Sequence, residues 1–409
     1  MSAAPAHKSG HEVQPAAIDT ARLPEAVGAK LRSLGMAMLA IGVVLGAAGF
    51  FVDRERFAFS YLAGFTTIVN ICVAALLFVI IQHLTKSVWS VAARRTMEQI
   101  ASFLPVAAIL FIPIALFSHT LWHHWMGPEA AHDHLLVHKK PYLNEGFFYI
   151  RAAFYFVLWG AVAWKFRADS LKQDETGDRK LTLGLRNLSP PMTLLVALTM
   201  TFAAFDWLMS LDPHWYSTVF GVYVFAGGTQ AMFALLAIIT VQLQVRGYFK
   251  RVSTVEHRHD IGKLTFGFTV FYAYIAFCQY FLIWYANIPE ETIFFRHRWE
   301  ENWQVVSLIL IFARFVVPFV LLLSRHTKRH PVGISVASGI ILFSHWIDHY
   351  WMVLPTHDEH SAHFSWVNLA GLALPVGVFL FWLSIRLSRE PLYPLKDPKL
   401  SATYKNVNL

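Results

Sequence analysis

The stretch SHWIDHYWMVLP, residues 344–355, places one carboxylate between two histidines in an otherwise apolar region. His345, Asp348 and His349 stand at positions i, i+3 and i+4, so a helix brings them to one face, and Met352 follows one turn later. An aspartate beside an imidazole can hold or pass a proton, because burial opposes ionisation of a carboxyl group and histidine titrates near neutral pH. Two other interpretations stay open: a structural ion pair between Asp348 and an arginine, and ligation of a metal ion or haem.

Three further charged residues interrupt apolar stretches: Arg151, Asp206 and Arg314. A charge at membrane depth costs several kcal/mol unless it is paired, so such residues usually face the bundle interior and mark ion or substrate paths. We expect Arg151 to balance the aspartates, and the deeper Arg314 to continue a proton route or to contact a tyrosine. The candidate proton-transfer residues are therefore Asp206, Asp348, His345, His349, Arg151 and Arg314.

Uncharged polar residues in apolar stretches offer a second kind of site. Gln230, Gln279 and Tyr280 can hydrogen-bond a quinone carbonyl, although such groups more often bond neighbouring helices. His119 can supply one ligand opposite the helix that carries His345 and His349, but no repeated set of facing histidines exists to hold a haem. We take these four residues, Gln279, Tyr280, Gln230 and His119, as candidate quinone-binding residues, and we predict no metal site.

A histidine-rich segment precedes Arg151 and reads SHTLWHHWMGPEAAHDHLLVHKK, residues 118–140. Its histidines can in principle bind zinc or copper, but the segment has no cysteine and no H-E-x-x-H motif. We favour an interfacial loop that serves as a docking surface. The histidines in question are His119, His123, His124, His132, His134 and His138.

Composition indicates the elements that must position these residues. The chain has 409 residues, of which 56% are hydrophobic and 15% charged, whereas soluble domains carry about 25% charged residues. Several apolar runs exceed the roughly 20 residues that cross a bilayer. We predict an all-α polytopic membrane protein with ten spans, at about 34–52, 57–85, 99–118, 146–165, 190–210, 217–244, 264–288, 301–323, 331–353 and 363–386.

Charge asymmetry predicts the orientation. Of the 34 Lys and Arg residues, 26 fall on the side of the membrane that holds the N-terminus and six in the opposite loops. The positive-inside rule therefore places both termini in the cytoplasm. The net charge of +8 reflects this bias and contact with anionic lipid headgroups rather than binding to nucleic acid. The first 33 residues contain no apolar signal region, so we expect the first span to act as an uncleaved anchor.

The two cysteines, Cys72 and Cys278, lie in separate apolar runs, and no C-x-x-C-H or four-cysteine set exists. The chain therefore cannot build a covalent c-type haem or an iron–sulfur cluster. It also lacks a P-loop motif, which argues against nucleotide-driven pumping. Any redox centre must belong to a partner or to a diffusible ligand.

Two segments four spans apart resemble each other: DWLMSLDPHW from Asp206 and DHYWMVLPTH from Asp348. We interpret them as traces of a parallel duplication, a common feature of membrane folds. The expected regions are an N-terminal tail (1–33), a flanking helix (34–56), a four-helix bundle (57–210), a second four-helix bundle (211–353), a last flanking helix (354–386) and a C-terminal tail (387–409).

Four motifs together resemble a known family: DHLLVHKKPYLNEGFFYIR (133–151), FDWLMSLDPHWYSTVFGVYVFAGG (205–228), FCQYFLIWYANIPEE (277–291) and IDHYWMVLP (347–355). They are similar to the smaller NrfD-like membrane subunit of bacterial alternative complex III, a quinol:cytochrome c oxidoreductase unrelated to the cytochrome bc1 complex. The resemblance covers essentially all ten spans. It implies two four-helix bundles, spans two to five and six to nine, with two flanking helices.

The resemblance also implies a setting in the bacterial inner membrane. The implied partners are a larger NrfD-like homologue, a periplasmic iron–sulfur subunit, multihaem and monohaem cytochromes c, small membrane-anchored subunits and, in some complexes, a cytochrome c oxidase. Haems and iron–sulfur clusters would then lie on partners, and quinone or menaquinone would be the diffusible ligand.

Three interpretations of the chain's own role follow. It is a non-redox subunit, not catalytic alone, that contributes a proton-transfer path and anchors the periplasmic subunits; or it binds quinol itself; or it is a purely structural scaffold. A fourth interpretation, an independent ion-coupled transporter, is less favoured, because few Gly or Pro residues break the predicted spans near their middle.

Overall fold

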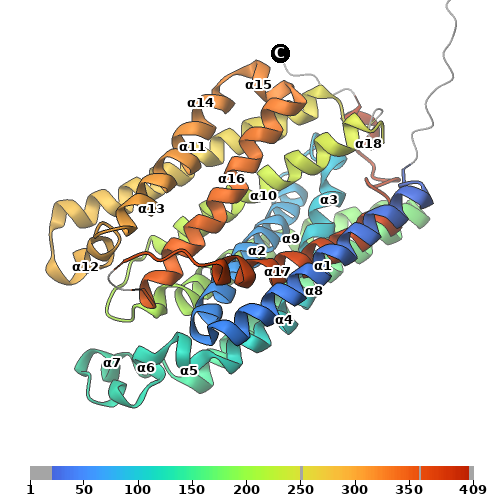
Figure 1. Ribbon diagram of the computed structural model, residues 1–409. Coiled ribbons are helices and arrows are strands. Elements are labelled where there is room, and N and C mark those ends of the chain that lie inside the picture. Colours follow the sequence, from blue (N-terminus) through green and yellow to red (C-terminus); the bar gives the residue numbers. More distant parts are fainter. Residues whose placement is uncertain (1–20, 249–251, 359–360, 405–409) are drawn as a thin grey trace, which may run out of the picture.

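The computed structural model describes residues 21–248, 252–358 and 361–404, and these parts contain helices and no strands (Figure 1). Ten helical segments are long and apolar enough to cross a membrane, so the prediction of a ten-span all-α membrane protein is confirmed at this level. They are α1 (Glu25–Val52), α2 (Arg54–Leu84), α3 and α4 (Val91–Ala101, Leu104–Leu116), α8 (Glu145–Thr176), α9 (Arg179–Trp207), α10 (Phe220–Val245), α11 (Val255–Ala286), α13, η3 and α14 (Trp303–Ile309, Leu310–Val316, Val317–Leu323), α16 (Pro331–Val353) and α17 (Trp366–Arg389).

Short helices occupy the ends of these spans. Figure 1 shows α5–α7 and α12 at one end of the long helices and α15 and α18 toward the other. At the first end lie α5 (Ser118–Leu121), α6 (His123–Met126), η1 (Pro128–Ala131), α7 (His134–Lys139), η2 (Met209–Leu211), α12 (Pro289–His297) and η4 (Leu354–Thr356). At the end that holds the start of α1 lie α15 (Arg325–Arg329) and α18 (Leu400–Thr403).

Helix boundaries follow local capping chemistry. The Asp53 side chain accepts a hydrogen bond from the Arg56 amide and so starts α2 directly after α1. The Asn144 side chain caps α8 in the same way. At the far end of α8, Gly177 adopts a left-handed φ of 71°, which ends the helix, and Asp178 then caps α9.

Helices α2 and α10 form the centre of the molecule, because 89% and 78% of the residues in their most apolar stretches are buried. They contact each other; α2 also packs on α3, α9, α16 and α17, and α10 packs on α9, α11 and α16. These two helices therefore form the centre around which the helices that carry the charged residues pack.

Helices α1 and α17 pack against each other at the periphery, which places the start of α1 beside the end of α17 (Figure 1). Every buried residue of α1 is a glycine, and a Cβ added at Gly42 would lie 2.5 Å from the Ala373 carbonyl oxygen. Small residues thus let the two backbones approach closely, as is common between membrane helices.

The predicted span boundaries differ from the structure mainly at the end that holds the chain termini. There α3 begins at Val91 rather than 99, α8 continues to Thr176 rather than 165, and α11 begins at Val255 rather than 264. Hydropathy marks only the apolar part of a helix, whereas backbone hydrogen bonding continues through the charged residues that follow. Arg94, Arg95 and Glu98, which the predicted boundary at residue 99 leaves outside the third span, are therefore buried residues of the third long helical segment.

The helical part of the structure also extends into both segments that the sequence predicts as tails, 1–33 and 387–409. Residues 1–20 and 405–409 lie outside the described part of the chain, α1 already begins at Glu25, and the segment after α17 packs against the helices instead of extending freely. Within that segment Leu392, Asp397 and Thr403 are buried.

Candidate functional site

Two buried arginine–aspartate pairs form the core of the candidate site. In the first, Arg151 on α8 donates from Nε and Nη2 to the two carboxylate oxygens of Asp206 on α9, both at 2.8 Å. Tyr155, one turn after Arg151, donates its hydroxyl to Asp206 at 2.8 Å. The guanidinium also donates to the Tyr142 carbonyl at 2.9 Å. The expected balancing of Asp206 by Arg151 is confirmed, and Asp206 is completely buried.

The second pair joins Asp348 on α16 to Arg314 on η3, with 3.6 Å between Oδ2 and Nη2. The hydroxyl groups of Tyr223 on α10 and Tyr272 on α11 both donate to Asp348 Oδ1, the latter at 3.0 Å. The Arg314 guanidinium lies 4.2 Å from the centroid of the Tyr272 ring, so the expected contact between Arg314 and a tyrosine is also confirmed. The tyrosines hold Asp348 more closely than its arginine does.

Arg314 reaches this position from a π-helical turn, Leu310–Val316, within an otherwise α-helical span. A π-helical turn shifts the residues that follow it around the helix axis, and such turns are frequent at functional sites. Gln230 on α10 donates to the Arg314 carbonyl oxygen at 3.1 Å and to Thr269 at 3.0 Å. Gln230 thus holds the π-helical turn against α10 and α11.

The two histidines have distinct hydrogen-bond roles. His345 Nε2 lies 3.2 Å from the Thr67 carbonyl oxygen, and its Nδ1 lies 2.9 Å from Arg314 Nη2. Because a carbonyl only accepts and a guanidinium only donates, the proton of His345 is on Nε2. His349 Nδ1 donates to the His345 carbonyl at 2.9 Å, and its Nε2 has no hydrogen-bond partner among the described residues. His349 therefore presents an unused basic nitrogen inside the protein.

A cavity of ≈ 30 Å³ lies beside His349 and is also lined by Asn70 of α2 and Trp207 of α9. Asn70 Oδ1 and Trp207 Nε1 are buried and have no hydrogen-bond partner among the described residues. A water molecule needs about 10–15 Å³ and two to four polar partners, so this cavity can hold one. Trp207 follows Asp206 directly, which places the cavity between the two charged pairs.

His345, Asp348 and His349 form the single group of three potential metal ligands among the described residues, with their ligand atoms within 4.8 Å of one another. Both nitrogens of His345 are already used, and the positive guanidinium of Arg314 contacts both His345 and Asp348. The cluster therefore fits an ion-paired site better than a metal site. The histidines of the loop from Ser118 form no such group in the described parts of the chain.

The candidate quinone-binding residues are not brought together. Tyr280 lines a cavity of ≈ 700 Å³ between α11 and the α13–α14 span, and this cavity also reaches Tyr223 and Tyr272. Gln279 and Gln230 are buried but are not among the lining residues, and Gln230 instead bonds between helices. His119 is exposed, 3.5 Å from the Glu145 carboxylate.

Sequence reasoning missed several residues that complete the site. The tyrosines Tyr155, Tyr223 and Tyr272 carry no charge and stand in aromatic-rich helices, so no sequence signal separates them from packing residues. Arg298, which the sequence places in an outer loop, is buried and donates to the carbonyl oxygens of Trp351 and Met352 at the end of α16. Burial lowers the pKa of the Arg298 guanidinium to about 9, which still leaves it charged at neutral pH.

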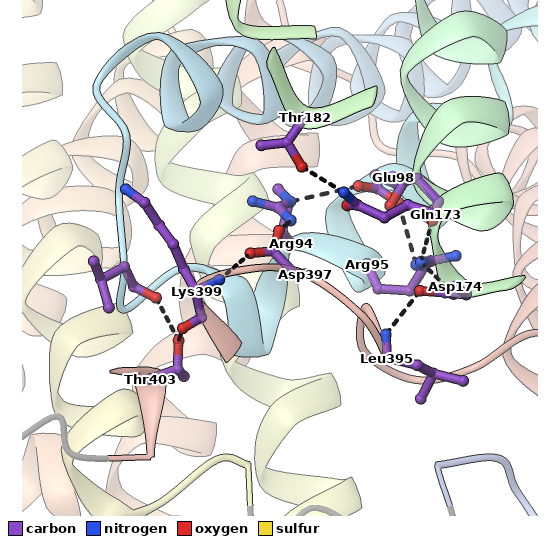
Figure 2. Close-up of polar contacts among 12 residues, drawn as sticks. Arg94, Arg95, Glu98, Gln173, Asp174, Thr182, Leu395, Asp397, Lys399 and Thr403 are labelled. Carbon is purple, nitrogen blue, oxygen red and sulfur yellow. Dashed lines mark hydrogen bonds and ion pairs between the residues drawn. The ribbon is translucent and has the colours of Figure 1, made fainter. Parts of the chain in front are cut away.

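A third charged cluster lies at the opposite ends of the spans, near the start of α3, and its contacts are drawn in Figure 2. Arg94 and Arg95 on α3 flank Glu98, and they pair with Asp397 of the C-terminal segment and Asp174 of α8. The sequence contains these residues as RRTME, residues 94–98, but hydropathy alone leaves them outside the predicted third span, 99–118.

Fold and site together define a helical membrane protein with ten candidate spans, in which two buried arginine–aspartate pairs lie near one end of the spans and a third charged cluster near the other end. The sequence matches no protein-family model and no curated protein. Function is therefore argued from the residues of the site.

Proposed function

We propose that this chain is a proton-transferring, non-redox membrane subunit of a quinol:cytochrome c oxidoreductase of the alternative complex III type. The observation that carries the proton-transfer role is the way Asp348 is held. Its carboxylate accepts from the hydroxyl groups of Tyr223 and Tyr272, its arginine lies 3.6 Å away, and His349 offers an unused nitrogen one residue later.

This arrangement tolerates a change of protonation. A proton that binds to a carboxylate oxygen of Asp348 neutralises it, and Arg314 then keeps its hydrogen bond to His345 and its contact with the Tyr272 ring. The tyrosine hydroxyl groups can rotate to accept from the protonated acid, because a hydroxyl both donates and accepts. Release of the proton restores the ion pair.

The proposed architecture is NrfD-like: two four-helix bundles, spans two to five and six to nine, with α1 and α17 flanking them. The positions of the charges support it, since Arg151 and Asp206 stand on spans four and five, and Arg314 and Asp348 stand on spans eight and nine. Helix packing supports it too, because α2 contacts α3 and α9 as α10 contacts α11 and α16.

The proposed orientation follows the positive-inside rule, with both termini in the cytoplasm of a bacterium and the two arginine–aspartate pairs near the periplasmic side. In the proposed complex the periplasmic surface, including the loop that contains α5–α7, faces the iron–sulfur subunit and the multihaem and monohaem cytochromes c. The larger NrfD-like homologue and small membrane-anchored subunits contact the spans, and a cytochrome c oxidase is a further partner.

The test is Asp348→Asn in the assembled complex, with quinol:cytochrome c turnover and proton release both measured. Asparagine keeps the shape and still accepts from the tyrosines, but it cannot bind a proton. We expect proton release per electron or turnover to fall at least tenfold while assembly and haem content stay unchanged. Unchanged turnover and proton release would instead favour the structural scaffold.

A second candidate function, quinol binding, is favoured by one observation: the ≈ 700 Å³ cavity is lined by aromatic side chains and borders the two tyrosines that contact Asp348. Tyr280 is the one predicted quinone-binding residue on its wall. Ala276 lines this cavity, so Ala276→Phe fills part of it, whereas Leu282→Phe alters an exposed position of the same helix. If the cavity binds menaquinol or another quinol, Ala276→Phe lowers the quinone content of the purified complex severalfold and Leu282→Phe leaves it unchanged. Equal quinone content in both variants would exclude this cavity as the site.

A further inference from the structure

Buried polar atoms without hydrogen-bond partners concentrate in one region of the described chain. More than a third of them belong to residues 82–99, at the ends of α2 and α3 nearest the chain termini. Buried polar groups in proteins are almost always hydrogen-bonded, to protein or to ordered water, so such a concentration indicates positions where ordered water can bind. The side chains concerned are Gln82, His83, Ser87, Ser90, Arg94, Arg95, Thr96, Glu98 and Gln99.

Glu98 is the central acid of this region. It lies 3.2 Å from Arg95 Nε and 3.6 Å from Arg94 Nε and is only 2% exposed. Its other polar neighbour is the Ser170 side chain, and neither carboxylate oxygen accepts a hydrogen bond of strict geometry from the described residues. The charged groups closest to it are Arg94 and Arg95 on α3 and Asp174 on α8. Around Arg94 lie further charged or titratable groups from three more elements: His83 on α2, Arg186 on α9, and Asp397 and Lys399 of the C-terminal segment.

The neighbouring acids are held much more firmly. Asp174 accepts from Arg95 and from the Leu395 amide, both at 2.7 Å (Figure 2). Asp397 accepts from Arg94 and from the Lys399 amide, the latter at 2.8 Å. Protonation of Glu98 therefore leaves neither arginine without a partner, and of the three acids Glu98 can gain and lose a proton at the smallest cost.

The segment 390–404, which we call the C-terminal strap, covers this cluster. Three hydrogen bonds hold the strap to the helices (Figure 2). Asp397 of the strap accepts from Arg94, the Leu395 amide of the strap donates to Asp174, and Thr403 Oγ1 of the strap donates to the Val88 carbonyl oxygen at 2.7 Å. Asp397 is 6% exposed and Thr403 fully buried, so the strap is packed as part of the fold. Water that reaches Glu98 from this side must pass beside it.

We propose that Glu98 is a proton-binding site on the cytoplasmic side of the membrane and that the C-terminal strap controls its access to water. The orientation and the use of the proton rest on the proposed function. The site would load protons at the face opposite to Asp348, as a second titratable group on the same subunit.

The test uses dicyclohexylcarbodiimide, which modifies protonated carboxyl groups in apolar surroundings, on the full chain in its purified complex. Peptide mass spectrometry is expected to find the adduct at Glu98, faster at pH 6 than at pH 8, and Glu98→Gln removes it. Asp397→Asn unfastens the strap and is expected to raise the labelling rate at least threefold. Asp169→Asn, which breaks an exposed ion pair with Lys165 on the same side, leaves the rate unchanged.

Absence of the adduct from Glu98 in both the native chain and Asp397→Asn overturns the proton site. Labelling that is equally fast in native chain and Asp397→Asn overturns the role of the strap. The labelling reaction needs no turnover, so it can also be measured in the Asp348→Asn complex. Labelling of Glu98 there would support the proton site even if the proposed function of Asp348 failed its own test. If Glu98 labels but Glu98→Gln leaves proton release unchanged, Glu98 does not serve proton transfer.

Discussion

Asp206 and Asp348 share residue type, burial and an arginine partner, yet their chemistry differs. The bidentate contact between Arg151 and Asp206 uses both carboxylate oxygens, which is the strongest arrangement of this kind of pair. Asp348 instead accepts from two hydroxyl groups, and Arg314 divides its contacts between Asp348 and His345. We infer that Asp206 stabilises the fold and that Asp348 exchanges protons.

This difference predicts unequal costs of the same substitution. Asp206→Asn leaves the Arg151 guanidinium buried without a counter-charge, and breaking a buried pair in this way costs about 3–5 kcal/mol. Asp348→Asn costs less, since Arg314 retains His345 and the tyrosines retain an acceptor. Thermal unfolding of the detergent-solubilised protein measures both, and the Asp206→Asn variant is expected to unfold at a clearly lower temperature. Equal shifts for the two variants would contradict the assignment of separate roles.

At the scale of helices, the contact of α1 with α17 depends on glycine rather than on large apolar side chains. Gly42→Leu introduces side-chain atoms where a Cβ alone already lies 2.5 Å from the Ala373 carbonyl oxygen. We expect overpacking to cost about 1–3 kcal/mol and to loosen α1 from the remaining spans. Val43→Leu, at the adjacent exposed position, is the matched control and should change nothing. Limited proteolysis near Asp53 would reveal a loosened α1; equal resistance of the two variants would show that the close approach is not needed.

Spans were the part of the fold that the sequence predicted well, because apolar length directly reports the bilayer thickness. At the side of the molecule that holds the chain termini, the helices extend further than the sequence predicts. Charged residues such as Arg94 and Glu98 continue the helix there while they lower its hydropathy. The π-helical turn around Arg314 left no sequence signal, because it depends on how Gln230 and its neighbours pack. Pairing of Arg151 with Asp206 was inferred from charge balance, whereas the donors Tyr223 and Tyr272 become visible only when α10, α11 and α16 meet.

At the scale of the whole molecule, α2 connects the two ends of the proposed proton route. Its Thr67 carbonyl contacts His345, and His83 lies beside the Glu98 cluster, 16 residues further along. At 1.5 Å per residue this separation is about 24 Å. The intervening side chains of α2 are almost all apolar and buried, Asn70 being the main exception. In the proposed route, two titratable sites separated by an apolar barrier would each exchange protons with one side, and the barrier would prevent a free leak between them.

The assignment of sites to sides of the membrane depends on orientation, which can be measured directly. Replacing Cys72 and Cys278 by alanine gives a cysteine-free background, in which Ala131→Cys and Thr176→Cys each add one exposed thiol at opposite ends of the spans. A membrane-impermeant maleimide applied to bacteria with a permeabilised outer membrane is expected to label Ala131→Cys and not Thr176→Cys. Permeabilising the inner membrane should make both react, which controls for accessibility. The reverse pattern would place Asp348 near the cytoplasm and Glu98 near the periplasm, and protons would then load and leave from the opposite sides.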